Sequence, residues 1–571
     1  MHVIATAGHV DHGKSTLVRA LTGVDPDRWE EEKQRGMTID LGFGATTLPS
    51  GRELAFVDVP GHVRFIKNML AGVGAVDACL FVVAATEGWK PQSEEHLRIL
   101  ELFGLFHGIV ALTKVGLCDD DLVELARLDL AEHLEGTFLE NAEVVEVDVP
   151  TGIGVQTLRE ALDRLAATTP RAADEGRPRL WVDRAFAAKG AGTVVTGTLT
   201  GGELHVEDEL QLFPGDATVR VRAIQSHHRT RPTAQPGSRV AVNLVGVAHT
   251  EVERGDVLVR AAQWHRTRMA DASLTVLASL DHEVSRRGAY VAYLGSGEVP
   301  VKVRVLGERA LAPGEEGLIR LHLPQLLPMR PGDRFVLRES GRKETVGGGQ
   351  ILDVAPVLPA SKARPDRSVD RVLRERGYVE TTELERLTGQ IREPNLGPWV
   401  MDPDRLAELR TQVEQLVATA GPLGLDVVSL DERQRAALAT IDGIRIEAGR
   451  VTVAEAVDPL ADHPYVAALD AAPFAPPPPD GVDRSELREL VRRGLVVSHE
   501  GVYFSAGALD AAALEVAALL RAKPDGVTVA EVRDALGCSR KHTLPLLSLL
   551  DGRGITRRRG DVRIGGPRLP G

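Results

Sequence analysis

Cysteine is scarce in this chain of 571 residues: its three copies, Cys79, Cys118 and Cys538, lie far apart with no metal-ligand spacing. This scarcity excludes a disulfide framework and a cysteine-based zinc site, so we expect reduced thiols in a cytoplasmic protein, none of them a nucleophile. Long apolar runs are also absent, because the longest, Ala78 to Ala85, falls far short of the ~20 residues that span a bilayer. We therefore expect no export segment and no membrane contact.

Net positive charge is missing from the chain as a whole, whose formal net charge is −13. This value argues against a protein that coats nucleic acid in general. The segment 511–571 differs, since it holds eleven Lys and Arg against six Asp and Glu. A basic module on an acidic body favours a polyanionic partner for the C-terminal segment, although a solvated surface without a partner has the same composition. The length suggests about four domains at ~150 residues each.

A glycine-rich stretch, Gly8-His9-Val10-Asp11-His12-Gly13-Lys14-Ser15, lies between an apolar run and a helix-like run. Its spacing of glycines, lysine and serine is that of a P-loop, whose backbone N–H groups surround a phosphate at a helix N-terminus. We expect Lys14 to contact the β and γ phosphates and Ser15 to ligate Mg²⁺. A chance glycine-rich turn is the alternative, and the strand, loop and helix order argues against it.

Two further motifs follow the P-loop. A charged segment, Asp27 to Gly36, precedes Thr38 and suits a loop ordered by the γ-phosphate, with Thr38 as a second Mg²⁺ ligand. An apolar strand then ends in Asp58-Val59-Pro60-Gly61-His62, where Asp58 can hold Mg²⁺ through water and the Gly61 N–H can contact the γ-phosphate. His62 is expected to position the attacking water. Apolar strands at 78–84 and 108–112 complete a doubly wound parallel sheet with ligands at the strands' C-terminal ends.

Together the P-loop, Arg35-Gly36-Met37-Thr38-Ile39-Asp40 and Asp58-Val59-Pro60-Gly61-His62 resemble the translational GTPases of the EF-Tu class. Within that class the run Gly-Met-Thr-Ile-Asp-Leu-Gly-Phe is most similar to the SelB family of selenocysteine-specific elongation factors. The resemblance implies a GTP hydrolase that uses GTP and Mg²⁺, with His62 as the catalytic residue. It also implies nucleotide-binding residues, which are Asp11, His12, Gly13, Lys14, Ser15, Thr16, Asp58, Gly61, Thr113, Lys114 and Asp148.

The base-recognition motif departs from that class. The class has Asn/Thr-Lys-x-Asp, whose carboxylate accepts hydrogen bonds from the guanine N1 and N2 donors, whereas this chain has Thr113-Lys114-Val115-Gly116. Gly116 supplies no acceptor, so the carboxylate has to come from the following turn, 119–121, or from Asp148. Asp148 lies in the fifth motif, where the class has a small Ser/Ala segment, and we hypothesise that it helps to recognise the base.

Short alternating strands with glycine turns follow, and they predict two β-barrels, at 176–262 and 264–356. Resemblance to SelB implies that Asp183, Arg184 and Arg239 line an aminoacyl pocket in the first barrel. A selenol is largely ionised at neutral pH, so the two guanidinium groups would favour it over the neutral hydroxyl of serine. An ordinary ion pair at a strand end, with no ligand, is the alternative.

The C-terminal third turns helical, and we expect winged-helix units at 366–408, 409–456, 457–507 and 508–571. Capping boxes are predicted at Thr382 and Glu385 and at Thr528 and Glu531. SelB proteins use the last such unit to bind a hairpin in selenoprotein mRNA. The predicted RNA-binding residues are Arg540, Lys541 and His542 at a helix start and Arg557, Arg558, Arg559 and Arg563 on the wing.

The sequence thus predicts a P-loop GTPase domain at 1–170, two β-barrels and C-terminal winged helices. Comparison of the affinities for GTP, GDP and ATP is the most direct test of the predicted nucleotide specificity. The predicted function is delivery of selenocysteinyl-tRNA to the ribosome at UGA codons by a monomer bound to the mRNA hairpin. A general translation GTPase, a nucleotide-impaired RNA-binding scaffold suggested by Gly116, and an RNA-remodelling ATPase are the alternatives.

Overall fold

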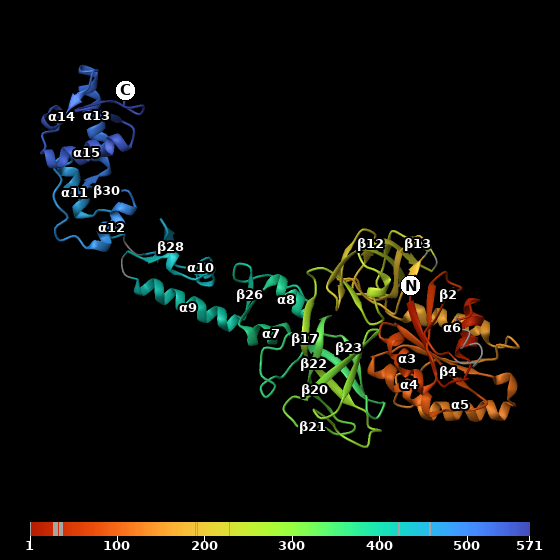
Figure 1. Cartoon of the computed structure of the whole chain (residues 1–571). Helices are drawn as coiled ribbons and strands as arrows, with labels where there is room; N and C mark the ends of the chain where they lie inside the picture. The colour runs from red at the N-terminus through yellow and green to blue at the C-terminus, as the bar shows by residue number, and fades with distance from the viewer. Residues whose placement is uncertain are drawn as a thin grey trace. The chain divides into compact units, whose positions relative to one another are not determined.

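The computed structural model describes residues 2–26, 32, 38–188, 190, 192–227, 229–420, 423–455 and 458–571. Of the segment expected to respond to the γ-phosphate, residues 27–31 and 33–37 lie outside this described part. The chain divides into two compact units, 1–393 and 394–571, which are treated separately below (Figure 1). Across the described ranges, no helix has the length and apolarity needed to cross a bilayer.

The first unit begins with a sheet whose strands run in the order β2-β3-β1-β4-β5-β6. All neighbours are parallel except β2, which is antiparallel to β3. The strands are β1 (His2–Ala7), β2 (Gly42–Thr47), β3 (Glu53–Asp58), β4 (Ala78–Ala84), β5 (Gly108–Thr113) and β6 (Val144–Val147). The helices are α1 (Lys14–Thr22), α3 (Ile66–Val73), α4 (Pro91–Leu102), α5 (Asp120–Leu134) and α6 (Val155–Thr168), with 3-10 turns η1 (Val63–Phe65) and η2 (Val115–Leu117).

Apolar cores cover both faces of this sheet. Alternate residues of β1 point to opposite faces, so that Val3 packs with α3, α4 and α5, whereas Ile4 packs with α1 and α6. The strand β4 is buried along its whole length because it has helices on both sides. The predicted doubly wound sheet is therefore confirmed, and its strand ends place the motif residues at one edge.

The next segment forms a closed barrel with the strand order β11-β16-β7-β9-β15-β12, closed by pairing of β11 with β12. The barrel strands are β7 (Arg179–Trp181), β9 (Gly192–Thr200), β11 (Glu209–Phe213), β12 (Ala217–Ser226), β15 (Arg239–Val245) and β16 (Val257–Arg260). Attached to it are β8 (Arg184–Ala188), β10 (Leu204–His205), β13 (Arg229–Arg231), β14 (Thr233–Ala234) and η3 (His249–Glu251). Inward apolar residues alternate with outward polar ones along β12, as a barrel requires.

A second closed barrel follows in the order β17-β22-β20-β19-β23-β24. Its strands are β17 (His265–Val276), β19 (Tyr290–Leu294), β20 (Gly297–Val305), β22 (Glu316–Met329), β23 (Arg334–Glu339) and β24 (Glu344–Asp353), with β18 (Val284–Ser285) and β21 (Ala310–Leu311) beside them. The unit ends with α7 (Val369–Arg376), β25 (Tyr378–Glu380) and α8 (Thr381–Thr388).

A buried ion pair joins the two barrels. Arg179 of β7 donates two hydrogen bonds of 2.6 Å to the carboxylate of Asp333, and both side chains are less than a tenth exposed. The Arg179 guanidinium also stacks 4.7 Å from the ring centroid of Trp264. Burial alone would raise the pKa of Asp333, but Arg179 holds that pKa below its ordinary value. The second barrel also packs on the parallel-sheet domain, since Tyr293 and Val336 share the apolar core that contains α3 and α4.

The second unit is made of helices and short hairpins. Its first elements are β26 (Trp399–Met401), α9 (Pro403–Thr419), β27 (Leu425–Asp426), η4 (Val427–Ser429), α10 (Glu432–Leu438), β28 (Ile444–Glu447) and β29 (Arg450–Val453). Then come α11 (Pro464–Ala471), α12 (Arg484–Arg492), β30 (Val496–His499) and β31 (Val502–Ser505). Glu489 of α12 is 2% exposed and bonds Arg492 and Arg493, and its carboxylate also lies 3.3 Å from Nε of Arg450. Arg492 above all lowers the pKa of Glu489 to about 2.

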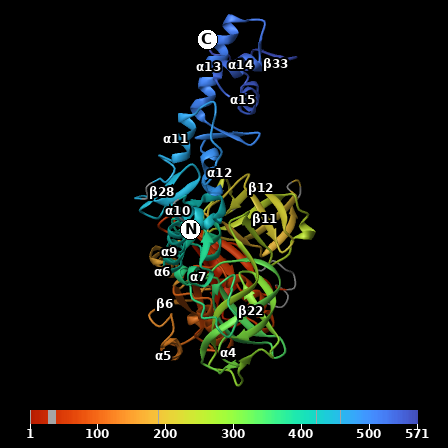
Figure 2. The ribbon, with the colours of Figure 1, turned by 90° about the vertical axis from the view of Figure 1, so that its left-hand side faces the viewer.

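The last module has α13 (Ala506–Ala522), α14 (Val529–Leu536) and α15 (Arg540–Gly552) beside a sheet of β32 (Val527–Thr528), β34 (Val562–Gly565) and β33 (Thr556–Arg559). Figure 2 shows the three helices and the hairpin gathered at the C-terminal end of the chain. The predicted capping box is confirmed, because Thr528 Oγ1 accepts from the Glu531 N–H at 3.3 Å and the Glu531 carboxylate accepts from the Thr528 N–H at 2.8 Å.

Three sequence predictions about helix limits are wrong. The boundary at 408/409 falls inside α9, a continuous helix whose Leu406, Val413 and Val417 share one core. The boundary at 507/508 falls inside α13, which begins after its cap at Ser505. The capping box at Thr382 and Glu385 does not form, because α8 begins one residue earlier, at Thr381.

Candidate functional site: a nucleotide loop and an aminoacyl pocket

The loop between β1 and α1 turns at two glycines in the left-handed region. Gly8 has φ 128°, and a Cβ there would lie 2.1 Å from the carbonyl oxygen of Val82, so only glycine fits against β4. Gly13 has φ 90° and caps α1 without a side-chain hydrogen bond, which leaves the first amides of the helix at the loop mouth. Asp11, with φ 63°, is exposed on the loop, and Thr16 is exposed in the first turn of α1. This geometry suits an anion.

Lys14 lies at the centre of the loop. Its side chain is almost fully buried and its Nζ donates to the carbonyl oxygens of Gly8, at 3.0 Å, and His9, at 2.6 Å. Gly61 closes the other side, because a Cβ at this position would lie 2.4 Å from Lys14 Nζ and 2.7 Å from the Val10 nitrogen. Any side chain at position 61 would therefore collide with the lysine or with the loop.

Oxygen atoms that suit a hard cation gather next to Lys14. Ser15 Oγ lies 2.7 Å from Thr38 Oγ1. Asp58 at the end of β3 is fully buried; its Oδ1 accepts a 2.7 Å bond from Thr6, but its Oδ2 has no hydrogen-bond partner among the described residues. Burial raises the pKa of Asp58, against the effects of Thr6, Ser15 and Lys14. An orphaned buried carboxylate oxygen beside two hydroxyls fits Mg²⁺, which prefers oxygen ligands.

His62 follows Gly61 and is half-buried. Its Nδ1 accepts a 3.2 Å hydrogen bond from the Arg64 N–H, so a neutral ring carries its proton on Nε2. In this tautomer Nε2 is a donor, so it can orient a water molecule but cannot take a proton from it. The geometry therefore matches the expected positioning role better than that of a general base.

His12, one of the two histidines in the loop between β1 and α1, faces inward. His12 is fully buried, its ring Nδ1 lies 3.3 Å from the Val82 carbonyl oxygen, and desolvation lowers its pKa to about 4. His12 is therefore a neutral residue that packs the loop against β4, and its buried ring is not exposed to a ligand. Thr113, at the end of β5, donates a 2.7 Å bond to the His12 carbonyl and ties the base-recognition edge to the P-loop.

The edge formed by the ends of β5 and β6 brings Lys114, Gly116 and Asp148 together. Lys114 has φ 62° and pairs with Glu87 at 3.0 Å. Asp148 is 4% exposed, and its Oδ2 accepts bonds from the N–H and the hydroxyl of Thr151 at 3.2 and 2.6 Å. A Cβ on Gly116 would lie 2.7 Å from that same Oδ2.

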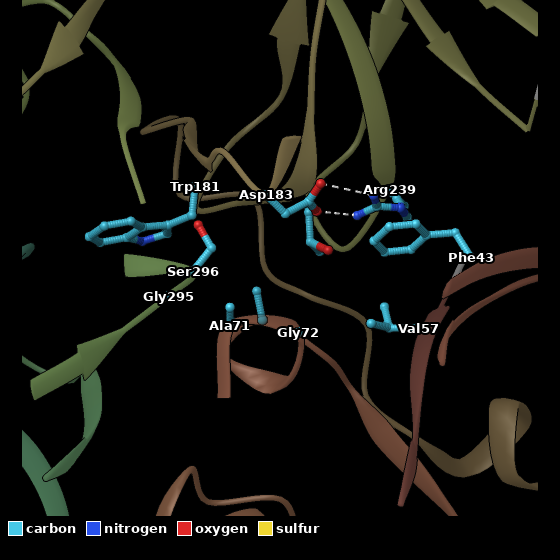
Figure 3. A pocket seen from close by; sticks show the side chains of 11 residues that line it. Phe43, Val57, Ala71, Gly72, Trp181, Asp183, Arg239, Gly295 and Ser296 are labelled. Atoms are coloured by element: carbon cyan, nitrogen blue, oxygen red, sulfur yellow. Dashed lines mark hydrogen bonds and ion pairs between the residues drawn. The ribbon is translucent and has the colours of Figure 1, made fainter. Parts of the chain in front are cut away.

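The residues of the predicted aminoacyl pocket also lie together. Arg239 makes a two-pronged ion pair with Asp183, at 2.5 and 3.0 Å, and Thr196 adds a 2.6 Å bond to Asp183 Oδ1. Burial opposes ionisation of Asp183, but Arg239 lowers its pKa below the ordinary value. Both side chains point into a cavity of about 20 Å³ that is also lined by Phe43 and Trp181 (Figure 3).

Phe43, Asp40 and Arg254 lie beside this cavity or its arginines, and they were not predicted as site residues. The Arg239 and Arg184 guanidinium carbons lie 3.4 and 4.5 Å from the Phe43 ring centroid. Arg184 donates to the carbonyl oxygen of Leu41, and Arg254 donates to Asp40 at 2.5 Å. These contacts join the first barrel to the segment just after Thr38. A sequence signal existed for Asp40 and Phe43, because both belong to the SelB-like run, but none existed for Arg254.

The predicted RNA-binding residues divide into exposed and buried ones. Arg540 and Lys541 are exposed at the start of α15, and His542, half-buried behind them, has its pKa lowered by burial and Lys541. Arg557, Arg558 and Arg559 are exposed along β33. Arg563 differs, since it is 7% exposed and bonds Asp551 at 3.2 Å. It is part of the module's interior rather than of the surface available to RNA.

A further group of possible metal ligands lies in the second barrel. One ligand atom each from His282, Glu339 and Glu344 lies within 4.8 Å of the others. The Arg342 guanidinium lies 3.7 Å from Glu339 and 3.9 Å from Glu344. This cation balances the carboxylates, so the group is an ion-pair network.

This fold and this loop define a GTPase-type domain of the translational class. Residues 1–168 match the model of the elongation factor Tu GTP binding domain, and residues 192–259 match elongation factor Tu domain 2. Residues 518–564 match the winged helix of elongation factor SelB. The fold class predicted from the sequence is therefore confirmed.

The particular resemblance is to selenocysteine-specific elongation factors. Those of Desulfomicrobium baculatum and Escherichia coli are 39% and 38% identical over 62% of this chain. The chain spans about half the length of these curated relatives, 55% and 56%. A crystal structure of a bacterial selenocysteine-specific elongation factor, EF-Sec, superposes with a TM-score of 0.72 at 26% identity, covering 99% of both chains. SelB from Methanococcus maripaludis in complex with a GTP analogue superposes over 62% of this chain, and 80% of its own, with a TM-score of 0.53 and 26% identity. The resemblance drawn from the motifs is thus confirmed.

Proposed function

We propose that this chain is a GTP hydrolase that delivers selenocysteinyl-tRNA to the ribosome at UGA codons while its last winged helix binds a hairpin of the selenoprotein mRNA. It acts in the cytoplasm, where ribosomes are, and as a monomer. The observation that carries the proposal is the polar connection between the nucleotide loop and the aminoacyl pocket. Asp40 lies two positions after the proposed Mg²⁺ ligand Thr38 and accepts a bond from Arg254 of the first barrel. Leu41 lies three positions after Thr38, and its carbonyl oxygen accepts a bond from Arg184 of the same barrel.

In the proposed hydrolysis, the P-loop amides and Lys14 bind the β and γ phosphates, and Lys14 exchanges its two carbonyl partners for phosphate oxygens. Ser15, Thr38 and Asp58 would hold Mg²⁺, and the ion would offset charge on the transferred group. His62 would donate from Nε2 to orient the water that attacks the γ-phosphorus. The bond from this phosphorus to the β–γ bridging oxygen breaks, GDP leaves, and the water proton ends on the released phosphate. The Gly61 N–H bonds a γ-phosphate oxygen and loses that bond when phosphate leaves.

In the proposed release of tRNA, loss of the γ-phosphate frees Thr38 and Gly61 from the nucleotide. The segment from Thr38 to Leu41 then relaxes, and its contacts with Arg184 and Arg254 weaken. Arg184 lies over Phe43 and Arg254 donates to the Asp183 carbonyl oxygen, so both support residues that line the proposed aminoacyl pocket and the affinity for selenocysteinyl-tRNA falls. In this scheme two hydrogen bonds, from Arg184 to Leu41 and from Arg254 to Asp40, couple the state of the nucleotide to the affinity for the tRNA.

A direct test compares the affinity for selenocysteinyl-tRNA with a non-hydrolysable GTP analogue and with GDP. The wild-type chain should bind this tRNA at least about tenfold more tightly with the analogue, a coupling of about 1.4 kcal/mol or more. Arg254→Met should bring the two affinities together, because it removes the bond to Asp40 but keeps an apolar stem.

The control is Arg266→Met, since Arg266 is an arginine of the second barrel that lies over Phe213 and pairs with Asp216. It should leave the coupling unchanged. Equal tRNA affinity in both nucleotide states of the wild type would overturn the proposal and favour a nucleotide-impaired RNA-binding scaffold. Equal affinity for selenocysteinyl-tRNA and other aminoacyl-tRNAs would favour a general translation GTPase.

A further inference from the structure

We infer that Asp148, after β6, supplies the carboxylate that recognises the guanine base in this chain, in place of the missing carboxylate at Gly116 after β5. The inference rests on the proposed function, because it concerns the nucleotide that function requires. It goes further in assigning base selectivity to an exchange of side chains between two adjacent loops.

The two positions compete for one volume. A Cβ on Gly116 would lie 2.7 Å from Asp148 Oδ2 and 2.8 Å from its Cγ. Real Cβ atoms are not found that close to another heavy atom, so a side chain at 116 and the observed Asp148 rotamer exclude each other. The carboxylate of Asp148 thus lies over the backbone of residue 116, in the volume that a side chain on residue 116 would enter.

The Asp148 carboxylate is also held in place. Both bonds from Thr151, at 3.2 and 2.6 Å, go to Oδ2, and the Asp148 N–H bonds the Ile153 carbonyl oxygen at 2.9 Å. Within the described part of the chain no hydrogen bond uses Oδ1. One oxygen is therefore anchored, and the other remains available to accept a bond from a ligand.

Other carboxylates near this edge are used differently. Asp119 caps α5 by accepting from the Leu122 N–H at 2.9 Å, and Asp120 and Asp121 are exposed in the first turn of that helix. Glu87 pairs with Lys114. Of the candidates considered from the sequence, Asp148 alone combines burial with contact at the 116 position.

The chemistry of the base then sets the selectivity. Guanine presents two adjacent donors, N1–H and the N2 amino group, which a carboxylate accepts as charge-assisted hydrogen bonds. Adenine presents a lone pair at N1, which the carboxylate repels. Xanthine keeps N1–H but has a carbonyl oxygen in place of the amino group, so it matches an amide, which accepts with its oxygen and donates with its nitrogen.

The first experiment measures binding of GDP, xanthosine diphosphate and ADP to the full-length wild type and to Asp148→Asn, by displacement of a fluorescent nucleotide. The wild type should prefer GDP to the other two nucleotides. Asp148→Asn should bind GDP at least about tenfold more weakly and xanthosine diphosphate at least about tenfold more tightly. Unchanged selectivity in Asp148→Asn would overturn the inference.

A second experiment returns the carboxylate to the other loop. Gly116→Asp alone should weaken GDP binding, because it places two carboxylates in one volume. The double variant Gly116→Asp with Asp148→Ser should recover guanine selectivity, and Gly116→Ala measures the effect of crowding without charge. Failure of the double variant to bind GDP better than Gly116→Asp would count against the exchange.

The two proposals fail in different ways. If the wild-type chain binds GDP no better than ADP, the GTPase function itself is refuted. If the wild type is selective for guanine but Asp148→Asn retains this selectivity, only the assignment to Asp148 is refuted and another group recognises the base. A reversal toward xanthine in Asp148→Asn would support both.

Discussion

Removal of the Arg184 charge should reduce discrimination between selenocysteinyl-tRNA and seryl-tRNA without abolishing tRNA binding. Arg184→Met keeps an apolar stem over Phe43, and it leaves the ion pair of Asp183 with Arg239 intact. Since Asp183 and Arg239 neutralise each other, Arg184 supplies the positive charge that a selenolate would meet. A seryl hydroxyl is neutral and loses little from the change.

The magnitude follows from Coulomb's law. Unit charges 4 Å apart interact by about 4 kcal/mol at an effective dielectric constant of about 20. The Arg184 side chain is 20% exposed and lies 3.9 Å from the Asp40 carboxylate, which offsets part of its charge. Halving the interaction gives about 2 kcal/mol, or roughly a thirtyfold loss in the ratio of affinities.

The assay measures how far the protein protects the aminoacyl ester of the tRNA from spontaneous hydrolysis as the protein concentration is raised. It is done with selenocysteine and with serine on the same tRNA. The wild type should protect the selenocysteinyl ester at lower concentration, and Arg184→Met should narrow that difference. Arg266→Met again serves as the control. A parallel loss of both affinities, or a ratio changed by less than about threefold, would refute the charge-based account.

Three further predictions concern other parts of the chain. His62→Ala should slow GTP hydrolysis by about 10²–10⁴-fold and leave the nucleotide affinity unchanged, because it removes only the donor to the attacking water. Single-turnover kinetics and GDP binding test this prediction. A loss of GDP affinity as large as the loss in rate would contradict it. Arg557→Ala and Arg558→Ala should each make the slope of log K against log salt concentration shallower by about one for binding to RNA hairpins, because each removes one phosphate contact. Binding measured between about 50 and 200 mM salt gives this slope. An unchanged slope would show that these residues do not contact the RNA. Glu489→Gln should lower the free energy of unfolding by about 1–3 kcal/mol. Because folding lowers the pKa of Glu489 to about 2, the wild-type contribution is complete above the ordinary carboxyl pKa and disappears as the pH falls toward 2, so denaturation midpoints of the two proteins should converge in acid.

The nucleotide loop was the most predictable part of the site. Gly8, Gly13, Lys14 and Ser15 lie within one short segment, so their spacing alone determines a strand, a turn and a helix start. Asp58 is the last residue of the buried strand β3, and Gly61 follows that strand closely. Both therefore lie at the edge of the sheet where the carboxyl ends of the parallel strands meet. In such cases the chemistry depends on local geometry, which the sequence carries directly.

Contacts between distant segments were less predictable. The bond from Arg184 to Leu41 joins residues 143 positions apart, and no local pattern specifies it. The inward position of Arg563 depends on Asp551, which α15 brings beneath the hairpin. The continuity of α9 was missed because the repeat spacing suggested a boundary where the helix runs on with good helix formers.

The buried pair of Arg179 and Asp333 has a consequence for how the molecule can change shape. It fastens the first barrel to the second, and the second shares an apolar core with the nucleotide domain through Tyr293 and Val336. The first barrel and the nucleotide domain meet mainly through arginine side chains, such as the 3.4 Å pair of Arg231 with Glu53 and the guanidinium groups of Arg184 and Arg239 over Phe43. Separation of the two barrels would leave a buried charge unpaired and would expose apolar surface, whereas loosening of the arginine contacts returns half-exposed charges to water and uncovers little apolar surface beyond Phe43. The envelope of the first unit should thus be nearly the same in both nucleotide states, and small-angle scattering of the two forms should nearly coincide.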